Sequence, residues 1–212
     1  IVCNHKKVIR VMKELNLSPR IKKKFTATTH SKHGLAIEPN RLKRRFDVKK
    51  PNTAWVGDIT YIWTDEGWLY LATVIDLCSR KVKGWAMSER ITSDLAVNAI
   101  NMALRSVKDT AGIVFHSDRG IQYAAQAFKS VIQNHGLQQS MSRKANCWDN
   151  AVAESFFSTL KRELIHYQKF KNREDAKLAI FDYIEIFYNR ARLHSSIGYA
   201  TPEMVELNAL CG

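Results

Sequence analysis

The run of residues 55–88 constrains the fold more than any other feature, because it predicts three successive strands. Its first part, WVGDITYIWT, is rich in β-branched and aromatic residues, which favour strands. After the turn Glu66-Gly67, the stretch GWLYLATVIDLCSRKVKGWAMS is long enough for two further strands that meet near Ser79 and Arg80. The pattern therefore predicts a three-stranded antiparallel meander.

Downstream of this meander, the hydrophobic period alternates between that of helices and that of short strands. Ser93 is the expected N-cap of the first helix. The predicted elements are a helix over residues 93–107, a strand over 112–118, a helix over 126–135, a strand over 137–142, a helix over 149–165 and a helix over 173–193. Together with the meander they predict an α/β fold in which helices flank a mixed five-stranded sheet.

The basic residues of the chain are concentrated near its N-terminus. Residues 1–54 hold 15 Lys and Arg against 3 Asp and Glu, whereas the remainder is balanced at 18 against 17. Residues 4–17 predict a short amphipathic helix, and residues 18–53 have no sustained period but contain the clusters IKKK and RLKRR. Such clusters favour a linker that contacts DNA over the alternative, a solubilising tail. We therefore divide the chain into a basic N-terminal segment, residues 1–50, and a core, residues 51–208.

Several classes of protein are disfavoured by composition. No apolar run approaches the roughly 18 residues of a membrane helix, so we expect no membrane partner. The start, IVCNHKK, lacks Met and the plan of a signal peptide, so we expect a partial chain. The cysteines lie far apart with no CxxC pair, which predicts free thiols in the reducing cytoplasm and neither a zinc site nor disulfides. They are Cys3, Cys78, Cys147 and Cys211.

The predicted helix over residues 149–165 places Glu154 at the border of its apolar face. A capping-box role is excluded, because Ala151, three residues before it, cannot cap a helix. Asp149 or Asn150 is the better N-cap. Glu154 is therefore either an ordinary solvated carboxylate or part of a site built with other segments.

Two further acids occupy positions where such a site can form. Asp58 lies inside the first predicted strand, and Asp118 ends the fourth, at an edge of the sheet where ligands commonly bind. Three carboxylates together repel one another and are stabilised by hard divalent cations. Two such ions about 4 Å apart can activate a nucleophile and stabilise a leaving oxygen in phosphodiester chemistry. The spacing of Asp118 and Glu154 is weak evidence by itself.

Other polar and aromatic residues have weaker interpretations. Asp76 is expected to be hydrogen-bonded to Ser79 or Arg80 at its turn and to stay outside the site. His116 orients Asp118, contacts DNA, or is a structural histidine. The remaining expectations are a loop-setting role for Asn146, Asp149 and Asn150, phosphate contacts for Arg190, Arg192 and His194, core positions for Tyr183, Phe187 and Tyr188, and packing or base stacking for Trp148.

Five local motifs, taken together with the spacing of Asp118 and Glu154, indicate a resemblance to a known family. They are W-x-x-D-I-T-Y around Asp58, L-A-T-V-I-D-L-x-S-R at 71–80, H-S-D-R-G-x-Q-Y at 116–123, D-N-A-x-x-E-S-F-F-S-T-L-K at 149–161 and Y-N-x-x-R-x-H-x-x-I-G-Y-x-T-P at 188–202. Over about residues 50–205 the chain resembles the second-frame transposases of the insertion-sequence-3 family, which have a retroviral-integrase-like catalytic core. It begins within what corresponds to their helix-turn-helix region. The zinc-binding His/His/Cys/Cys module of retroviral integrases is absent from the sequence.

The resemblance implies an RNase H-like fold with Asp58, Asp118 and Glu154 as an acidic triad that binds two Mg²⁺ or Mn²⁺ ions. It implies no organic cofactor. Lys161, about 10 Å further along the helix, corresponds to a residue that contacts the terminal DNA, although a lysine extended along the surface is the alternative. The other expected DNA contacts are Lys22, Lys23, Lys24, Arg41, Lys43, Arg44, Arg45, Arg119, Arg143 and Lys144.

The function implied is transposition of double-stranded DNA by a homo-oligomer in the bacterial cytoplasm, at the nucleoid. The triad cleaves a strand at the end of the element, and the freed 3′-hydroxyl attacks another phosphodiester, joining the ends into a circle that later inserts into target DNA. Two alternatives are a catalytically inactive DNA-binding regulator and an RNase H-like nuclease that cuts without joining.

Overall fold

The computed structural model describes residues 4–17, 34–143 and 146–211. Its centre is a mixed sheet of five strands in the order β3-β2-β1-β4-β5. The strands are β1 (Ala54–Thr64), β2 (Gly67–Asp76), β3 (Val82–Ser88), β4 (Val114–Ser117) and β5 (Gln138–Met141). Strands β1, β2 and β3 pair antiparallel, and β1, β4 and β5 pair parallel. The predicted meander and mixed five-stranded sheet are therefore confirmed.

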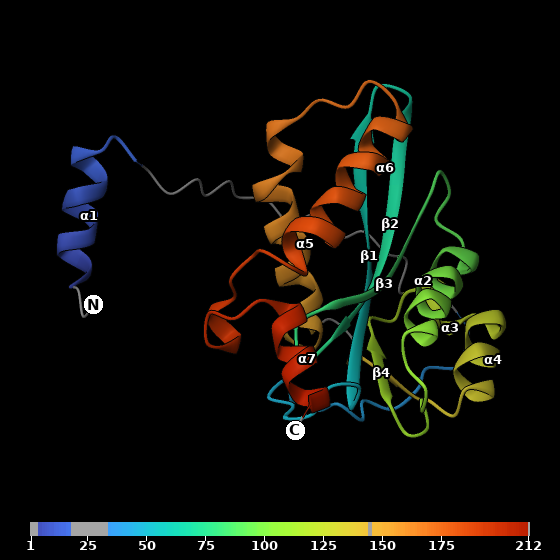
Figure 1. The fold of residues 1–212 in the computed structure, drawn as a ribbon. Coiled ribbons are helices and arrows are strands. Elements are labelled where there is room, and N and C mark those ends of the chain that lie inside the picture. The colour runs from blue at the N-terminus through green and yellow to red at the C-terminus, as the bar shows by residue number, and fades with distance from the viewer. Residues whose placement is uncertain (1–3, 18–33, 144–145, 212) are drawn as a thin grey trace.

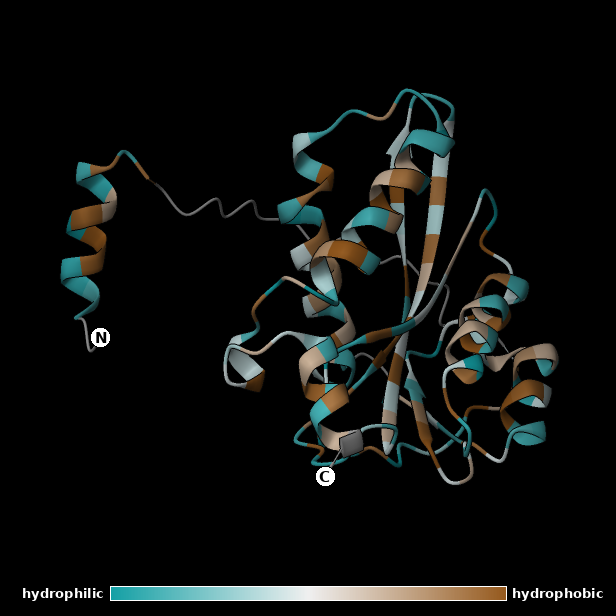
Figure 2. Ribbon diagram, viewed as in Figure 1, coloured by the Kyte–Doolittle hydropathy of each residue, from teal (hydrophilic) through white to brown (hydrophobic). Residues whose placement is uncertain are grey.

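Helices cover both faces of this sheet (Figure 1). One face packs against α2 (Ser93–Arg105), α3 (Ile121–Ala124) and α4 (Gln126–Asn134) through a core that includes Trp55, Ile100 and Phe128. The other face packs against α5 (Ala151–Glu163) and α6 (Arg173–Phe181) through a core that includes Phe156 and Leu160. Brown bands recur along the central strands, and the helices are banded brown and teal, as expected for amphipathic helices that bury one side (Figure 2).

Several shorter helical elements and a last helix lie between and after these main helices. They are the 3₁₀ turns Cys147–Asn150, Ile165–Tyr167 and Ser195–Ile197, the π-helical segment Asp182–Tyr188, and the last helix, α7 (Pro202–Cys211). No helix in the described part of the chain has both the length and the apolarity needed to cross a bilayer.

Several predicted boundaries need correction. Asp65 and Glu66 join β1 to β2, Thr92 and not Ser93 is the N-cap of α2, and the predicted final helix turns π-helical at Asp182. A π-turn closes an i→i+5 hydrogen bond, which brings Tyr188 to the same side as Tyr183. Both tyrosines are buried as predicted.

Aromatic residues outside this core correct two further expectations. Phe187 is exposed, so its predicted core position is wrong. Trp148 is 68% exposed, so its predicted packing is wrong, and base stacking stays a prediction.

Residues 34–48 lie against the core, although the sequence predicts a linker there. Leu42 is buried among the residues of the α5 face, and Phe46 and Val48 pack beside it. The backbone N–H groups of Arg41 and Leu42 both donate to Ser140 Oγ, at 2.9 and 3.2 Å. These residues therefore form a strap across the edge strand β5, and the boundary between residues 50 and 51 stays a prediction.

Helix α1 (His5–Glu14) begins at the predicted position, with Asn4 as its N-cap. None of its residues is buried. Val8, Ile9 and Val11 on its apolar side are exposed in the described structure.

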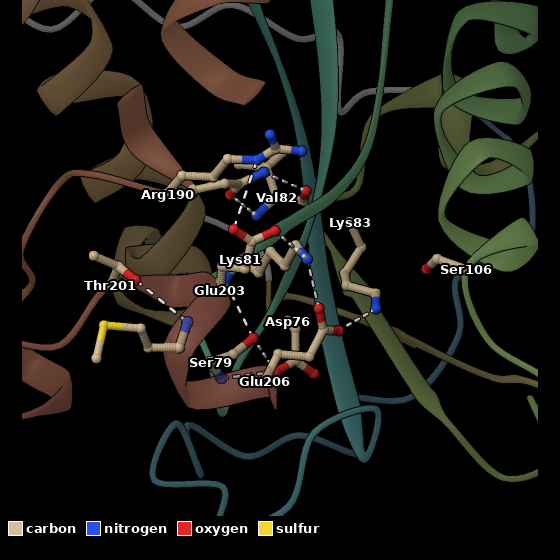
Figure 3. Close-up of polar contacts among 12 residues, drawn as sticks. Asp76, Ser79, Lys81, Val82, Lys83, Ser106, Arg190, Thr201, Glu203 and Glu206 are labelled. Atoms are coloured by element: carbon tan, nitrogen blue, oxygen red, sulfur yellow. Dashed lines mark hydrogen bonds and ion pairs between the residues drawn. The ribbon is translucent and has the colours of Figure 1, made fainter. Parts of the chain in front are cut away.

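The C-terminal segment covers the opposite edge strand, β3. The side-chain amide of Asn189 accepts from the Val82 N–H at 3.0 Å and donates to the Val82 carbonyl at 3.1 Å, so it continues the ladder at this edge. The ammonium groups of Lys81 and Lys83 both point to the Glu206 carboxylate of α7 (Figure 3). All three side chains are largely removed from solvent, which makes this a buried ionic clamp between α7 and β3.

Candidate active site

The sheet register brings Asp58 and Asp118 to neighbouring positions. Val56 of β1 pairs with His116 of β4 in the parallel ladder, so residues 58 and 118 stand at the same level two residues further along. Adjacent strands lie about 4.8 Å apart. Both carboxylates are half-buried. Asp58 accepts from the N–H of Ile59 at 2.8 Å, and Asp118 accepts from the N–H of Gly120 at 2.9 Å.

Glu154 approaches these two residues from the helix α5. The buried side chains Ala153, Phe156 and Phe157 fix α5 against the sheet and leave Glu154 half-buried at the border of the packed face. The structure therefore places Asp58, Asp118 and Glu154, from three elements, within one region.

The pKa values of the carboxylates record this proximity. Burial, followed by the charge of Asp118 and then that of Glu154, raises the pKa of Asp58 well above its ordinary value. Burial and the charge of Asp118 also raise the pKa of Glu154. A pKa that is raised by a neighbouring carboxylate indicates that the two acidic groups lie close enough to repel one another. Within the described ranges, no three His, Cys, Asp or Glu side chains form a ready-made metal cage.

Lys161 lies two turns after Glu154 on the same side of α5, beside strand β1. Its ammonium group is 4.9 Å from the centre of the Tyr61 ring, and it lies close enough to Asp58 to lower that residue's pKa. Burial lowers the pKa of Lys161, and the charge of Asp58 opposes this effect. Lys161 is thus held at the site by a cation–π contact and partial burial, and its contact with DNA stays a prediction.

Two buried amide oxygens near the carboxylates have no hydrogen-bond partner among the residues that the structure describes. They are Gln122 Oε1 and Asn150 Oδ1, in side chains that are 6% and 4% exposed. Gln122 Oε1 lies beside Asp118, because both would contact a Cβ built on Gly120, at 3.1 and 2.9 Å. Asn150 donates to the carbonyl of Gly57 at 3.4 Å, next to Asp58. The set of unsatisfied oxygens suits the water shell and ligands of a hard cation.

Sequence reasoning missed Gln122 and Tyr123 as site residues. Tyr123 is buried, and its pKa is raised by burial and by the charges of Asp58 and Asp118. Both residues belong to the motif H-S-D-R-G-x-Q-Y, so the signal was present within the stretch that identified Asp118.

Asp76 and His116 are structural. Asp76 accepts from the N–H and the hydroxyl of Ser79 at 2.8 and 2.9 Å, which confirms its predicted role at the turn. His116 is buried and hydrogen-bonded to the hydroxyls of Ser140 and Ser142 at 2.8 and 3.2 Å. Of its three interpretations, the structural one fits these contacts.

His116 makes stability sensitive to acid. Burial lowers its pKa to about 4, so between pH 6.5 and 4 the unfolded chain binds the proton first and stability falls as the pH falls, by up to roughly 3 kcal/mol. Burial lowers the pKa of His194 to about 4 as well, so a variant is needed to separate the two. We expect His116→Gln to be less stable at pH 7 but to lose less stability on acidification, measured by urea unfolding at pH 7 and 4.5. Parallel losses in the two proteins would contradict this assignment.

Apart from Lys161, the predicted DNA-contacting residues divide into three groups. Lys22, Lys23, Lys24 and Lys144 lie outside the described residues. Arg41, Lys43 and Arg45 are exposed on the strap, although Arg41 Nε also donates to the carbonyl of Gln139. Arg44 and Arg143 form ion pairs with Asp149, and Arg119 Nε donates to the carbonyl of Ser142 at 2.7 Å. Arg41, Arg44, Arg119 and Arg143 therefore make contacts within the protein. The DNA contacts of all the predicted residues stay predictions.

Asp149 is not the side-chain cap that the sequence suggests. Asn150 stands at the N-cap position of α5 but makes no capping hydrogen bond through its side chain. The Asp149 carboxylate turns instead to the two arginines, which hold its pKa well below its ordinary value.

The candidate phosphate ligands near the C-terminus are also paired. Arg192 donates to both carboxylate oxygens of Glu163 at 2.8–3.0 Å, and Arg190 lies 3.6 Å from Glu203. The ring of His194 packs against that of Tyr188. These contacts engage Arg190, Arg192 and His194 within the protein, and their phosphate contacts stay predictions.

Known proteins with a similar sequence or fold define the class of protein to which this chain belongs. Residues 48–147 and residues 135–202 each match a family described as Integrase core domain. The fold is similar to that of a chain of the simian T-cell lymphotropic virus intasome, with a TM-score of 0.63, 18% identity and coverage of 84% of this chain and 60% of that one. It is also similar to the HTLV-2 integrase catalytic core domain solved in complex with magnesium, with a TM-score of 0.56, 16% identity and coverage of 74% and 97%. The fold is RNase H-like, as predicted.

The curated relatives narrow the class to a family. The chain is 45% identical over 203 residues to the transposase InsF for insertion sequence IS3A of Escherichia coli K12, covering 96% of this chain and 70% of that protein. It is 46% identical over 202 residues to an uncharacterized 31 kDa protein of insertion element IS600 of Shigella sonnei, covering 95% and 74%. The chain belongs to the IS3 family of insertion-sequence transposases, which are polynucleotidyl transferases.

Proposed function

We propose that this chain is the catalytic part of a transposase that cleaves DNA at the ends of its insertion sequence and transfers the freed strand. The observation that supports this most strongly is the convergence of three carboxylates from β1, the end of β4 and α5, two of which have pKa values raised by a neighbouring carboxylate. Family membership supports the same assignment.

The donor set fits Mg²⁺ or Mn²⁺, because carboxylate and amide oxygens are the ligands that these ions prefer. Asp58, Asp118 and Glu154 would hold two ions per site. The magnesium complex of the HTLV-2 integrase core supports a divalent ion in this fold. When bound, such ions activate an attacking hydroxyl and stabilise a leaving oxygen.

Two displacements at phosphorus account for the reaction. In the first, a water oxygen bonds to phosphorus at the element end, and the bond to the 3′ oxygen breaks, leaving a 3′-hydroxyl. In the second, this hydroxyl bonds to the phosphorus of another phosphodiester and releases the 3′ oxygen of that strand. No covalent bond to the protein forms. Lys161, fixed over Tyr61 beside Asp58, would bind the terminal DNA and align it with the carboxylates.

Double-stranded DNA, as element end and as target, is the proposed partner. Two ends must be held together for joining, so the active form is a homo-oligomer. The basic N-terminal segment would add contacts with phosphates. The proposed site of action is the bacterial cytoplasm, on nucleoid DNA.

An assay with labelled DNA tests the function. The chain is incubated with Mg²⁺ and a labelled duplex that has the terminal sequence of its element, and the products are separated on a denaturing gel. Joined strands longer than the substrate support a transposase. Shortened strands alone would indicate a nuclease, and binding without new products would indicate a regulator.

Gly120 provides a test of how finely Asp118 is placed. A Cβ on Gly120 would lie 2.9 Å from Asp118 Oδ1, and its φ of −59° is one that alanine adopts readily. Gly120→Ala should therefore displace the carboxylate and lower strand transfer by about 10²-fold, the cost of an error near 1 Å, with little change in melting temperature. Gly34→Ala is the matched control, because nothing lies within 4 Å of its added Cβ. Equal activity of the two variants would argue against Asp118.

A further inference from the structure

We propose that Arg44, Arg143 and Asp149 form a positioning device that places Glu154 only when the strap of residues 34–48 is docked on the core. This inference rests on the proposed function, because it assigns these residues to the alignment of the same carboxylates. It links the segment that follows the basic N-terminal residues to the helix that supplies the third carboxylate.

The Asp149 carboxylate is the centre of the cluster. Its side chain is 0% exposed. It accepts five hydrogen bonds: from Asn40 Nδ2 at 2.9 Å, Arg44 Nε at 2.8 Å, and Arg143 N, Nε and Nη2 at 2.9, 3.0 and 3.0 Å. A buried carboxylate needs such compensation, since an unpaired buried charge is strongly destabilising. Asp149 therefore depends on the strap for two of its five donors.

The contacts of Asp149 extend to both sides of the catalytic region. Asp149 belongs to the 3₁₀ turn Cys147–Asn150, which leads directly into α5 and therefore to Glu154 one turn later. The next residue, Asn150, donates to the carbonyl of Gly57, which precedes Asp58. The cluster thus fixes the start of α5 relative to β1.

Both the side chain and the backbone of Arg44 are held in a specific conformation. Its Nη2 donates to Asn146 Oδ1 at 2.5 Å while its Nε donates to Asp149. Lys43 and Arg44 have φ values of 49° and 60°, a region that residues other than glycine seldom adopt. Such a backbone persists where the surrounding contacts over-determine it. The strap is therefore held in place by specific contacts at Arg44, and not only by burial of Leu42.

A contact with DNA is the competing role for Arg44, and the two roles predict different behaviour. If Arg44 is a positioning residue, its substitution changes the rate of strand transfer at saturating DNA and the metal concentration that the reaction requires. A phosphate contact affects DNA affinity and its salt dependence, with a change of about 0.9 in the slope of log K against log salt.

The test compares Arg44→Ala, Arg44→Lys, Asp149→Asn and the double variant Arg44→Ala/Asp149→Asn in the full chain. We expect each single variant to lower strand transfer at saturating DNA, by about 10- to 100-fold for Arg44→Ala, with DNA affinity unchanged. The Mn²⁺ concentration that gives half of the maximal rate should rise, and excess Mn²⁺ should restore part of the lost rate. The double variant should be no worse than the worse single variant, since both remove one interaction. Arg44→Lys should be impaired because an ammonium cannot reproduce the two directed bonds.

Lys49→Ala is the matched control, because it removes a basic residue from the same region whose partner, Asp47, is exposed. It should leave the rate at saturating DNA and the metal requirement unchanged, because a lost phosphate contact affects DNA affinity and not these two quantities. Hydrogen exchange gives a readout that needs no catalysis: amides of residues 146–154 should exchange faster in Arg44→Ala than in wild type or Lys49→Ala.

The proposal is overturned if Arg44→Ala lowers DNA affinity and the salt slope but leaves the saturated rate intact. Unchanged exchange over residues 146–154 in Arg44→Ala would also overturn it. If the wild-type chain joins no DNA, the proposed function fails, and the exchange experiment still decides whether the cluster fixes the start of α5.

Discussion

Glu154→Gln should abolish metal-dependent strand transfer while leaving the fold and DNA binding intact. The amide keeps the size of the side chain but removes the negative charge that a divalent ion requires. Loss of several kcal/mol of transition-state stabilisation, taken as roughly 4 kcal/mol, corresponds to about a 10³-fold slower reaction. Because burial and Asp118 raise the pKa of Glu154, removing its charge should also make the metal-free protein slightly more stable.

Glu174→Gln, on the exposed side of α6, is the control for this change. It should leave activity as it is. Strand transfer near the wild-type rate in Glu154→Gln would remove Glu154 from the catalytic group, whatever its position on α5.

Glu206→Ala should have the largest effect on stability. Glu206 compensates two lysines, and the side chain of Lys83 is only 4% exposed, so the substitution leaves a buried positive charge unpaired (Figure 3). Removing one partner of a buried ion pair costs about 3–5 kcal/mol. At roughly 2–4 °C per kcal/mol for a chain of this size, the melting temperature should fall by about 6–20 °C, as calorimetry would measure.

Replacing the lysine as well separates charge from packing. Lys83→Met combined with Glu206→Leu should recover most of the lost stability, because apolar residues of similar size can replace a buried pair. If the double variant were as unstable as Glu206→Ala, the clamp would owe its strength to packing of α7 and not to the ion pairs.

Elements with a clear hydrophobic period could be predicted from the sequence. The alternation in residues 55–88 and the apolar stripe of α5 depend on local geometry, so strands β1 to β3 and the packed face of α5 followed directly. The neighbouring positions of Asp58, inside β1, and Asp118, just after β4, also followed, because adjacent strands of one sheet bring residues at the same level together. The sequence placed Glu154 only at the border of the apolar face of α5. Its approach to strands β1 and β4 could not be predicted, because it depends on how α5 packs against the sheet.

The strap and the Asp149 cluster could not be predicted in the same way. Residues 34–48 have no period, since their contacts are single side chains that fit a surface built by residues about 100 positions away. Basic residues in such a segment suggest DNA contacts from sequence alone. Arg44 and Arg143 instead compensate a buried carboxylate, which only the fold brings to them.

Diffraction at the manganese edge from Mn²⁺-soaked crystals of the chain with a terminal DNA duplex tests most directly whether the three carboxylates bind metal together. The expected result is anomalous density within about 2.2 Å of oxygens from Asp58, Asp118 and Glu154, with the part next to Glu154 lost in Glu154→Gln. Density bound elsewhere, or bound to the two aspartates with Glu154 turned to solvent, would contradict the proposed triad.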